Sequence, residues 1–193
     1  MTPIDAVVLA GGRSRRMGRD KAAMPLDGQR MVDRMCRRLE PLGGQVIIAR
    51  GDQPSLGLVD EVADEPGLVG PMAGIVAGLR AVRSATAAIV AVDMPSVDPI
   101  VLRRLDELMR AEGRAAALPL VHGVAQPLHA VIDTEALPVI IALALGGEGS
   151  PRRLMARIDA LLVGPDGWGP LDPVGAFAAD WDSPTDIRST AQG

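Results

Sequence analysis

The chain of 193 residues has few aromatic side chains: two tryptophans, one phenylalanine and no tyrosine. Its core must therefore be built from valine, leucine, isoleucine, alanine and methionine, and the hydrophobic content of 48% is sufficient for this. A chain of this length fits one domain with a substantial buried core. The charged content of 23% is also ordinary for a globular protein.

Cysteine and long apolar runs are scarce as well. Cys36 is the only cysteine, which excludes an intramolecular disulfide and a cysteine-based zinc site. We interpret it as a small apolar residue on an amphipathic helix. No apolar run is long enough to span a bilayer, and the N-terminus lacks the pattern of a signal peptide. We therefore expect a cytoplasmic protein that does not bind a membrane.

Positive charge is limited overall but concentrated in one segment. The net charge of −4 argues against general binding of nucleic acid. Directly after the apolar run Ile4–Leu9 and the pair Gly11-Gly12, however, come five cations: Arg13, Arg15, Arg16, Arg19 and Lys21. Glycine amides can approach phosphate oxygens closely, and cations offset the charge that grows during phosphoryl transfer. The segment predicts a site for a small polyphosphate, the alternative being a basic solvated turn.

The spacing within this segment differs from the two common phosphate-binding fingerprints. It is neither GxxxxGK[ST] nor GxGxxG, because the two glycines come first and Lys21 lies beyond Gly18. This spacing disfavours both a P-loop kinase and a dinucleotide-dependent dehydrogenase.

Apolar runs rich in valine and isoleucine alternate with segments of helical periodicity. The runs predict strands at Ile4–Leu9, Gln45–Ala49, Ala87–Val92, Ala115–Leu120 and Ala125–Ile132. The periodic segments predict helices at Met31–Leu42, Pro71–Val82 and Pro99–Glu112, and Pro151–Leu162 is a basic amphipathic segment. This alternation is typical of a three-layer α/β/α fold with a mostly parallel open sheet.

We expect a single domain over residues 1–193, with a nucleotide half at about 1–112 and an acceptor half at about 113–193. The stretch after Gly164, rich in glycine, proline and aspartate as far as Asp182, predicts a long ordered loop or short edge structure.

Asp93 follows the third predicted strand and precedes Met94-Pro95. Ligands of parallel α/β sheets bind at the carboxyl ends of the strands. A carboxylate at that position could hold Mg²⁺, which accepts carboxylate and phosphate oxygens while it keeps several waters. The structural alternative is a helix N-cap or a turn residue.

The stretch Asp64–Gly74 contains glycines and a proline that suit a tight turn opening into a helix. Pro71 falls near the first position of that helix, between Gly70 and Gly74. The helix N-terminus carries partial positive charge and free amides, so a base or a phosphate could bind there. The alternative is that these residues only allow close packing.

Two later segments are less decisive. Gln126-Pro127-Leu128 interrupts a strand-like stretch, and we interpret His129 behind it as a core or edge histidine with its hydrogen bonds satisfied. Residues 180–186 resemble a helix start in which Asp182 precedes Ser183-Pro184, so a capping role is the alternative to a ligand role. No serine, histidine and aspartate set or zinc-ligand spacing is evident.

Taken together, these motifs resemble the molybdenum cofactor guanylyltransferases of the nucleotidyltransferase superfamily. The resemblance spans nearly the whole chain. It begins with Leu9-Ala10-Gly11-Gly12, Arg16-Met17-Gly18 and Lys21, and continues in order with Gly70-Pro71-Met72-Ala73-Gly74, Asp93-Met94-Pro95, Gln126-Pro127-Leu128 and Asp182-Ser183-Pro184. It implies a Rossmann-like nucleotidyltransferase fold.

The resemblance also implies a reaction, in which GTP and molybdopterin give the guanine dinucleotide cofactor and pyrophosphate with Mg²⁺ as the metal. The implied catalytic residues are Arg16, Lys21 and Asp93, with Asp93 as the metal ligand. The implied nucleotide site comprises Leu9, Ala10, Gly11, Gly12, Arg13, Lys21, Asp64, Gly74 and Asp93. The implied acceptor site comprises Gln126, Arg152, Arg153 and Asp182. Cofactor-pathway proteins and molybdoenzymes are the implied protein partners.

Two positions bear on the choice of substrates. Gly11 and Gly12 give the form Leu-Ala-Gly-Gly where related cytidylyltransferases usually read Leu-Ala-Ala-Gly, and the missing methyl group leaves room for a purine. Such steric differences discriminate by only about 1–3 kcal/mol, so GTP is favoured over CTP without excluding it. Asp182 stands where the family often has asparagine, and it cannot donate a hydrogen bond as an amide does. The alternatives are a molybdopterin cytidylyltransferase, a sugar-1-phosphate nucleotidyltransferase and a catalytically idle nucleotide- or cofactor-binding protein.

Overall fold

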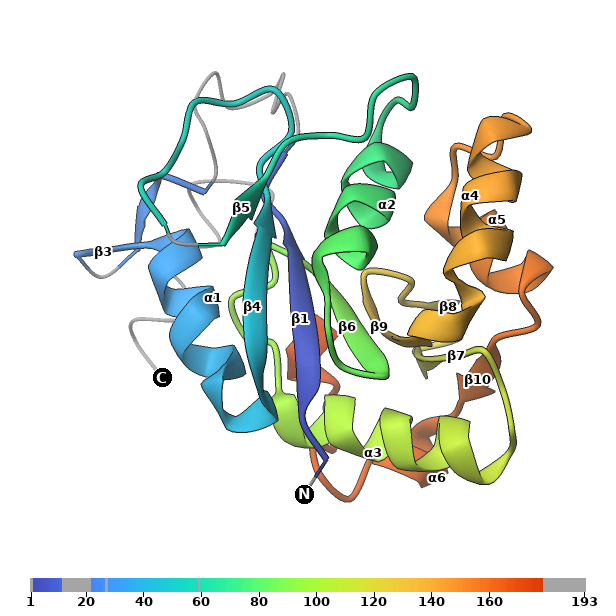
Figure 1. The fold of residues 1–193 in the computed structure, drawn as a ribbon. Helices are drawn as coiled ribbons and strands as arrows, with labels where there is room; N and C mark the ends of the chain where they lie inside the picture. The colour runs from blue at the N-terminus through green and yellow to red at the C-terminus, as the bar shows by residue number, and fades with distance from the viewer. Residues whose placement is uncertain (1, 12–21, 27, 59, 179–193) are drawn as a thin grey trace.

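The structure is a computed structural model that describes residues 2–11, 22–26, 28–58 and 60–178. In these residues an eight-stranded sheet forms the centre of the molecule, in the order β10-β7-β9-β6-β1-β4-β5 with β8 paired to β7 (Figure 1). The strands are β1 (Ile4–Leu9), β4 (Gly43–Ala49), β5 (Glu61–Val62), β6 (Thr86–Ala91), β7 (Ala116–Val121), β8 (Val124–Ala125), β9 (His129–Asp133) and β10 (Leu161–Val163). A separate small hairpin pairs β2 (Pro25–Leu26) with β3 (Gln29–Arg30).

The sheet is mostly parallel, as the sequence predicts. β1 runs parallel to both β4 and β6, β4 to β5, and β10 to β7. The exceptions are β9, which is antiparallel to β6 and β7, and β8, which forms a hairpin with β7. Consequently β9 begins at the edge where β6 ends.

Two helical layers cover the sheet (Figure 1). α1 (Met31–Leu39), α3 (Pro99–Ala111) and α6 (Pro165–Trp168) cover one face, and α2 (Pro71–Ala81), α4 (Leu137–Leu145) and α5 (Pro151–Arg157) cover the other. Short 3-10 helices occupy Glu40–Leu42, Thr134–Ala136 and Ala176–Ala178. Every residue of β1 and β6 is buried, because each strand lies between two apolar layers. Successive side chains of β1 enter opposite layers: Val8 packs on the α1 and α3 side, and Val7 on the α2 side.

The predicted helices agree with α1, α2 and α3 to within a few residues, but two later expectations are corrected. The predicted strand Ala125–Ile132 is divided into β8 and β9 by the turn at 126–128. The amphipathic segment Pro151–Leu162 is helical only as far as Arg157, and its last residues begin β10. α4 was not predicted, because its sequence LPVIIALAL is apolar on all sides and shows no helical periodicity.

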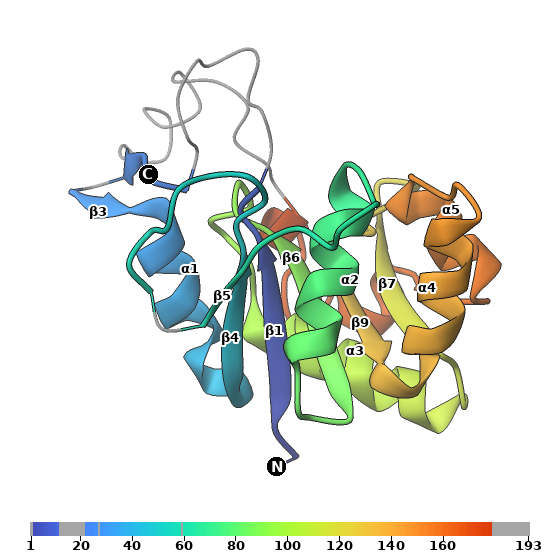
Figure 2. The same cartoon turned by 45° about the horizontal axis from the view of Figure 1, so that its top comes forward.

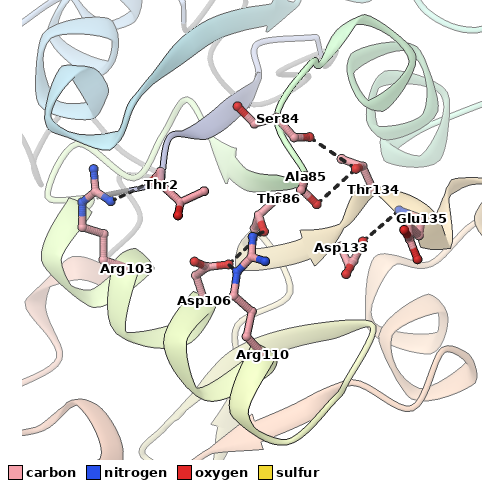
Figure 3. Close-up of polar contacts among 10 residues, drawn as sticks. All are labelled: Thr2, Ser84, Ala85, Thr86, Arg103, Asp106, Arg110, Asp133, Thr134 and Glu135. Atoms are coloured by element: carbon pink, nitrogen blue, oxygen red, sulfur yellow. Dashed lines mark hydrogen bonds and ion pairs between the residues drawn. The ribbon is translucent and has the colours of Figure 1, made fainter.

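The amino edge of the sheet, where the parallel strands begin, is closed by polar side chains (Figure 3). The Thr86 hydroxyl donates to Asp106 Oδ1 at 2.8 Å and accepts from Arg110 at 2.5 Å, and Arg110 Nε also reaches Asp106 at 2.8 Å. Nearby, the Asp5 carboxylate is 2% exposed and accepts the Gln45, Arg83 and Ser84 amides and the Ser84 hydroxyl. These contacts fasten β1, β4 and β6 at one end. In the part of the chain described, no helix is long and apolar enough to cross a membrane.

Candidate functional site

The carboxyl ends of β1, β4 and β6 meet at the opposite edge of the sheet, where α2 also begins (Figure 2). The amides of Ala10 and Gly11 both donate to the Ala49 carbonyl at 2.9 Å. On the other side, the Val92 amide donates to the Leu9 carbonyl at 3.1 Å. The predicted nucleotide residues Leu9, Ala10 and Gly11 therefore lie between the ends of β4 and β6.

Gly11 lies directly against the turn that follows β4. A Cβ atom built on Gly11 would lie 2.7 Å from the Gly51 nitrogen, a clash with backbone that leaves no room for alanine. Gly51 itself has φ of +64°, a conformation that favours glycine. Sequence reasoning missed the Arg50–Asp52 turn, although an apolar run followed by glycine is the same signal that identified the first loop.

Asp64 lies between this turn and α2. Cβ atoms built on Gly51 and Gly74 would each lie 3.5 Å from one of its carboxylate oxygens. Burial raises the pKa of Asp64, and the negative charge of Asp52 raises it further. A carboxyl group with a perturbed pKa at the ligand edge of an α/β sheet is a candidate for ligand binding.

The first turn of α2 packs closely against the same residues. Gly70 precedes the helix with φ of +67° and Pro71 is its first residue, as the sequence predicts. A Cβ built on Gly74 would lie 3.2 Å from Leu9 Cδ2 and 3.4 Å from the Ala49 Cβ. The glycine therefore allows the amide-rich N-terminus of α2 to approach the end of β1, which supports both the packing and the binding interpretation.

Asp93 lies two residues beyond β6, at the same edge and partly buried. It belongs to a turn in which the Met94 amide donates to the Ala91 carbonyl at 3.2 Å. The N-cap of the following helix α3 is Asp98, whose carboxylate accepts the Ile100 amide at 2.8 Å. Asp93 is thus a turn residue beside the end of β1 and does not cap α3.

Gln126 lies on the far side of β6 from β1. The backbone amide of Gln126 donates to the Pro119 carbonyl at 3.0 Å, and its backbone carbonyl accepts the His129 amide at 3.1 Å. The Ala91 amide donates to the Leu128 carbonyl at 3.2 Å, which joins this turn to the end of β6. The predicted acceptor residue is therefore at the same edge as Asp93.

Of the other predicted acceptor residues, the structure describes Arg152 and Arg153 but not Asp182. Arg152 and Arg153 are exposed in the first turn of α5, and Arg153 Nε pairs with Glu148 at 3.0 Å. The predicted site residues Gly12, Arg13, Arg16, Lys21 and Asp182 lie outside the described residues.

His129 is buried, as expected, but the expectation that its hydrogen bonds are satisfied is wrong. It is 0% exposed, and neither ring nitrogen has a hydrogen-bond partner in the described structure. Complete burial lowers the pKa of His129 to about 3, against a smaller opposite effect of Asp172. The imidazole is therefore neutral at pH 7.

A cavity of about 630 Å³ lies at the amino edge, away from these residues. Arg110, Arg114, Asp133 and Val139 are among the residues that line it. Its arginines already have partners, because Arg110 binds Asp106 and Thr86 while Arg114 pairs with Asp159. The cavity is therefore a weaker candidate than the carboxyl edge.

Comparison with known proteins identifies the class to which the chain belongs. The family described as "MobA-like NTP transferase domain" matches residues 6–161, which span β1 through the start of β10. The crystal structure of molybdopterin-guanine dinucleotide biosynthesis protein A from Archaeoglobus fulgidus has a similar fold, with a TM-score of 0.81, 23% identity and 96% of each chain covered. The fold and the match to this family together show that the protein is a nucleotidyltransferase.

Curated relatives narrow the class to a family. The "Probable molybdenum cofactor guanylyltransferase" of Opitutus terrae is 38% identical over 157 residues, covering 78% of this chain and 77% of that protein. The molybdenum cofactor guanylyltransferase of Pseudomonas fluorescens is 33% identical over 177 residues, covering 86% of each. The chain belongs to this family of MobA-like nucleotidyltransferases.

Proposed function

We propose that the protein transfers GMP from GTP to molybdopterin and releases pyrophosphate. The observation that carries the proposal is the carboxyl edge, where Gly11 packs on Gly51 with Asp64 on one side and Asp93 on the other. The family to which the chain belongs supports the choice of GTP and of the pterin, because its relatives are named for that transfer.

The reaction is a displacement at phosphorus. An oxygen of the terminal phosphate of the pterin attacks the α-phosphorus of GTP, and the bond between the α- and β-phosphates breaks. The electron pair leaves with pyrophosphate, so no protein nucleophile is required and positioning with charge neutralisation is sufficient. Cys36 fits this scheme, because burial raises the pKa of its thiol and keeps it protonated.

The nucleoside is assigned to the glycine-lined part of the edge. Leu9, Ala10 and Gly11 line this part at the end of β1, and Asp64 and Gly74 line the opposite side. Gly12 and Arg13 complete this site in the proposal, and Arg16 and Lys21 neutralise the triphosphate.

Asp93 is the proposed ligand of Mg²⁺. No group of three or more histidine, cysteine, aspartate or glutamate side chains that could hold a metal occurs in the described residues. A single carboxylate fits Mg²⁺, which binds nucleotides through one or two carboxylates, substrate phosphates and waters. When bound there, the ion would supply positive charge to the phosphate oxygens of GTP.

The acceptor is assigned to the other side of β6. Gln126 lies beside the end of β6, and Arg152 and Arg153 are exposed at the start of α5, where Arg153 would exchange its surface pair with Glu148 for the phosphate. Arginine suits phosphate because its planar group donates two parallel hydrogen bonds. Asp182 is the remaining proposed acceptor residue.

The test is pyrophosphate release by purified protein with Mg²⁺, molybdopterin and each of GTP, CTP, ATP and UTP in turn. GTP should give the fastest release, and omission of molybdopterin is the control for simple hydrolysis. Equal turnover with CTP would overturn the assignment of the base. If no nucleotide supports transfer to molybdopterin, the assignment of molybdopterin as the acceptor is wrong.

A further inference from the structure

Three rings of the described residues, those of Trp168, Phe177 and His129, lie together beside the sheet. Trp168 of α6 and Phe177 meet edge to face with ring centroids 5.1 Å apart, and Phe177 contacts the His129 ring at 4.5 Å. These three side chains are at most 3% exposed. Trp168 Nε1 also donates to the Val163 carbonyl at 3.1 Å, which fixes the orientation of the stack.

Residues 164–178, which we call the strap, carry two of these rings. Gly175 has φ of +68°, and a Cβ built on it would lie 2.8 Å from Val121 Cγ1 of β7. The Phe177 amide donates to Asp172 Oδ2 at 2.9 Å. These contacts hold the strap tightly against the sheet, so the position of Phe177 relative to β9 is fixed.

The third ring connects the strap to the predicted acceptor side. His129 is the first residue of β9, and its amide donates to the Gln126 carbonyl at 3.1 Å. The turn at 126–128 is held in addition by the bonds from Gln126 to Pro119 and from Ala91 to Leu128. His129 therefore joins the turn, through its backbone amide, to the strap, through the contact of its ring with Phe177.

The imidazole contributes to this arrangement through its ring rather than through its nitrogens. Neither nitrogen has a partner in the described structure, and a buried polar group without a partner is destabilising. Leucine at this position would remove the unpaired nitrogens while it loses the ring contact. The effect of this substitution on the stability of the fold can therefore be measured separately from its effect on the position of the turn.

We propose that Phe177 and His129 are positioning residues that hold the turn at 126–128 for the acceptor. This inference rests on the proposed function, which assigns Gln126 to acceptor binding. The nucleoside part of the edge is separate, because Gly11, Gly74 and Asp64 surround the ends of β1 and β4 and the start of α2, whereas the turn is bonded to the end of β6. A change in the stack is therefore expected to affect the acceptor while the residues around the nucleoside keep their contacts.

The kinetic test uses Phe177→Leu and His129→Leu with GTP and molybdopterin as substrates. Each variant should raise the KM for molybdopterin by about fivefold or more and leave the KM for GTP within about twofold, because only the acceptor side is displaced. His129→Leu should do so without lowering the melting temperature at pH 7. The matched control is Leu102→Ala, a fully buried truncation in α3, which should lower the melting temperature and leave both KM values unchanged.

A second readout is independent of the pterin. In Phe177→Leu, hydrogen exchange of the Gln126 and His129 amides should become faster, while exchange of the Ala10 and Gly11 amides stays as in the wild type. Unchanged exchange at Gln126 and His129, or parallel changes in the two KM values, would overturn the positioning role. A wild type that transfers nothing to molybdopterin would overturn the proposed function and, with it, the acceptor role of the turn.

Discussion

Asp5 at the amino edge and Asp64 at the carboxyl edge are both partly or fully withdrawn from solvent, but their surroundings differ. Burial tends to raise the pKa of Asp5, yet hydrogen bonds from Arg83, Ser84 and Gln45 outweigh it and the pKa is lowered. For Asp64, burial and the charge of Asp52 act in the same direction and the pKa is raised. The charged form of Asp5 at the amino edge is thus stabilised by hydrogen bonds, whereas the charged form of Asp64 at the carboxyl edge is destabilised by its surroundings.

This difference suggests that the amino edge stabilises the fold and that the carboxyl edge is available for ligand binding. At the amino edge, buried charge is compensated within the fold, as the Thr86, Asp106 and Arg110 network also shows (Figure 3). At the carboxyl edge, glycine backbone and carboxylates face each other, so ligand groups can supply the compensation. Changes at the first edge should affect folding, and changes at the second should affect transfer.

The largest effect is expected for Asp93→Asn. The change keeps the shape of the side chain but removes the charge that the proposal assigns to Mg²⁺, so the transfer rate should fall by about 100-fold or more. Pyrophosphate release at saturating GTP measures this loss, and an unchanged thermal melt is the control for folding. Activity within a few-fold of the wild type would remove Asp93 from the metal site.

The next contrast pairs Asp5→Ala with Asp64→Ala. Loss of Asp5 leaves buried donors without an acceptor, so unfolding in urea should become easier by about 3 kcal/mol. Asp64→Ala should change stability by about 1 kcal/mol or less while it raises the KM for GTP. Because the pKa of Asp5 is lowered on folding, its stabilising effect is complete at pH 7 and is lost only as the pH falls through its folded value. If both variants unfold equally easily, the contrast between the edges is wrong.

His129 gives a smaller, pH-dependent effect. Its pKa is lowered to about 3 in the fold from 6.5, so the unfolded chain binds a proton that the folded chain does not between these values. Stability should therefore decrease below pH 6.5, by about 2 kcal/mol at pH 5. Urea unfolding at pH 7 and pH 5 measures the decrease, and His129→Leu should reduce it by that amount. The same pH dependence in both proteins would contradict the burial of a neutral imidazole.

The smallest effect concerns Asp52→Asn. Removal of the Asp52 charge should lower the pKa of Asp64 toward its ordinary value, and burial should still keep it raised. Titration of the side-chain carboxyl carbon by NMR measures the shift, with the exposed Asp60→Asn as the control. No change in the titration of Asp64 would show that the two carboxylates do not interact.

Much of the architecture could be predicted because buried parallel strands are continuous apolar runs, as in Ile4–Leu9, and because helices such as α3 show clear periodicity. α4 lacks a polar face, and β10 contains only three residues, so local sequence carries no decisive signal for either. Tertiary packing determines both elements.

The candidate site was predictable to the extent that its residues follow strands. Gly11 and Asp93 come at strand ends, which parallel pairing brings to one edge. The contact of Gly11 with Gly51 depends on the register of β1 against β4, and the unpaired nitrogens of His129 depend on the position of the strap. Neither follows from local residue patterns.

In the proposed function the carboxyl edge, rather than the amino edge with its cavity, binds the nucleotide. Backbone amide NMR during titration with GTP and Mg²⁺ tests it most directly. The shift changes should concentrate at Gly11, Gly51, Asp64 and Gly74. Changes concentrated instead around the cavity, at Arg110, Arg114 and Asp133, would contradict it.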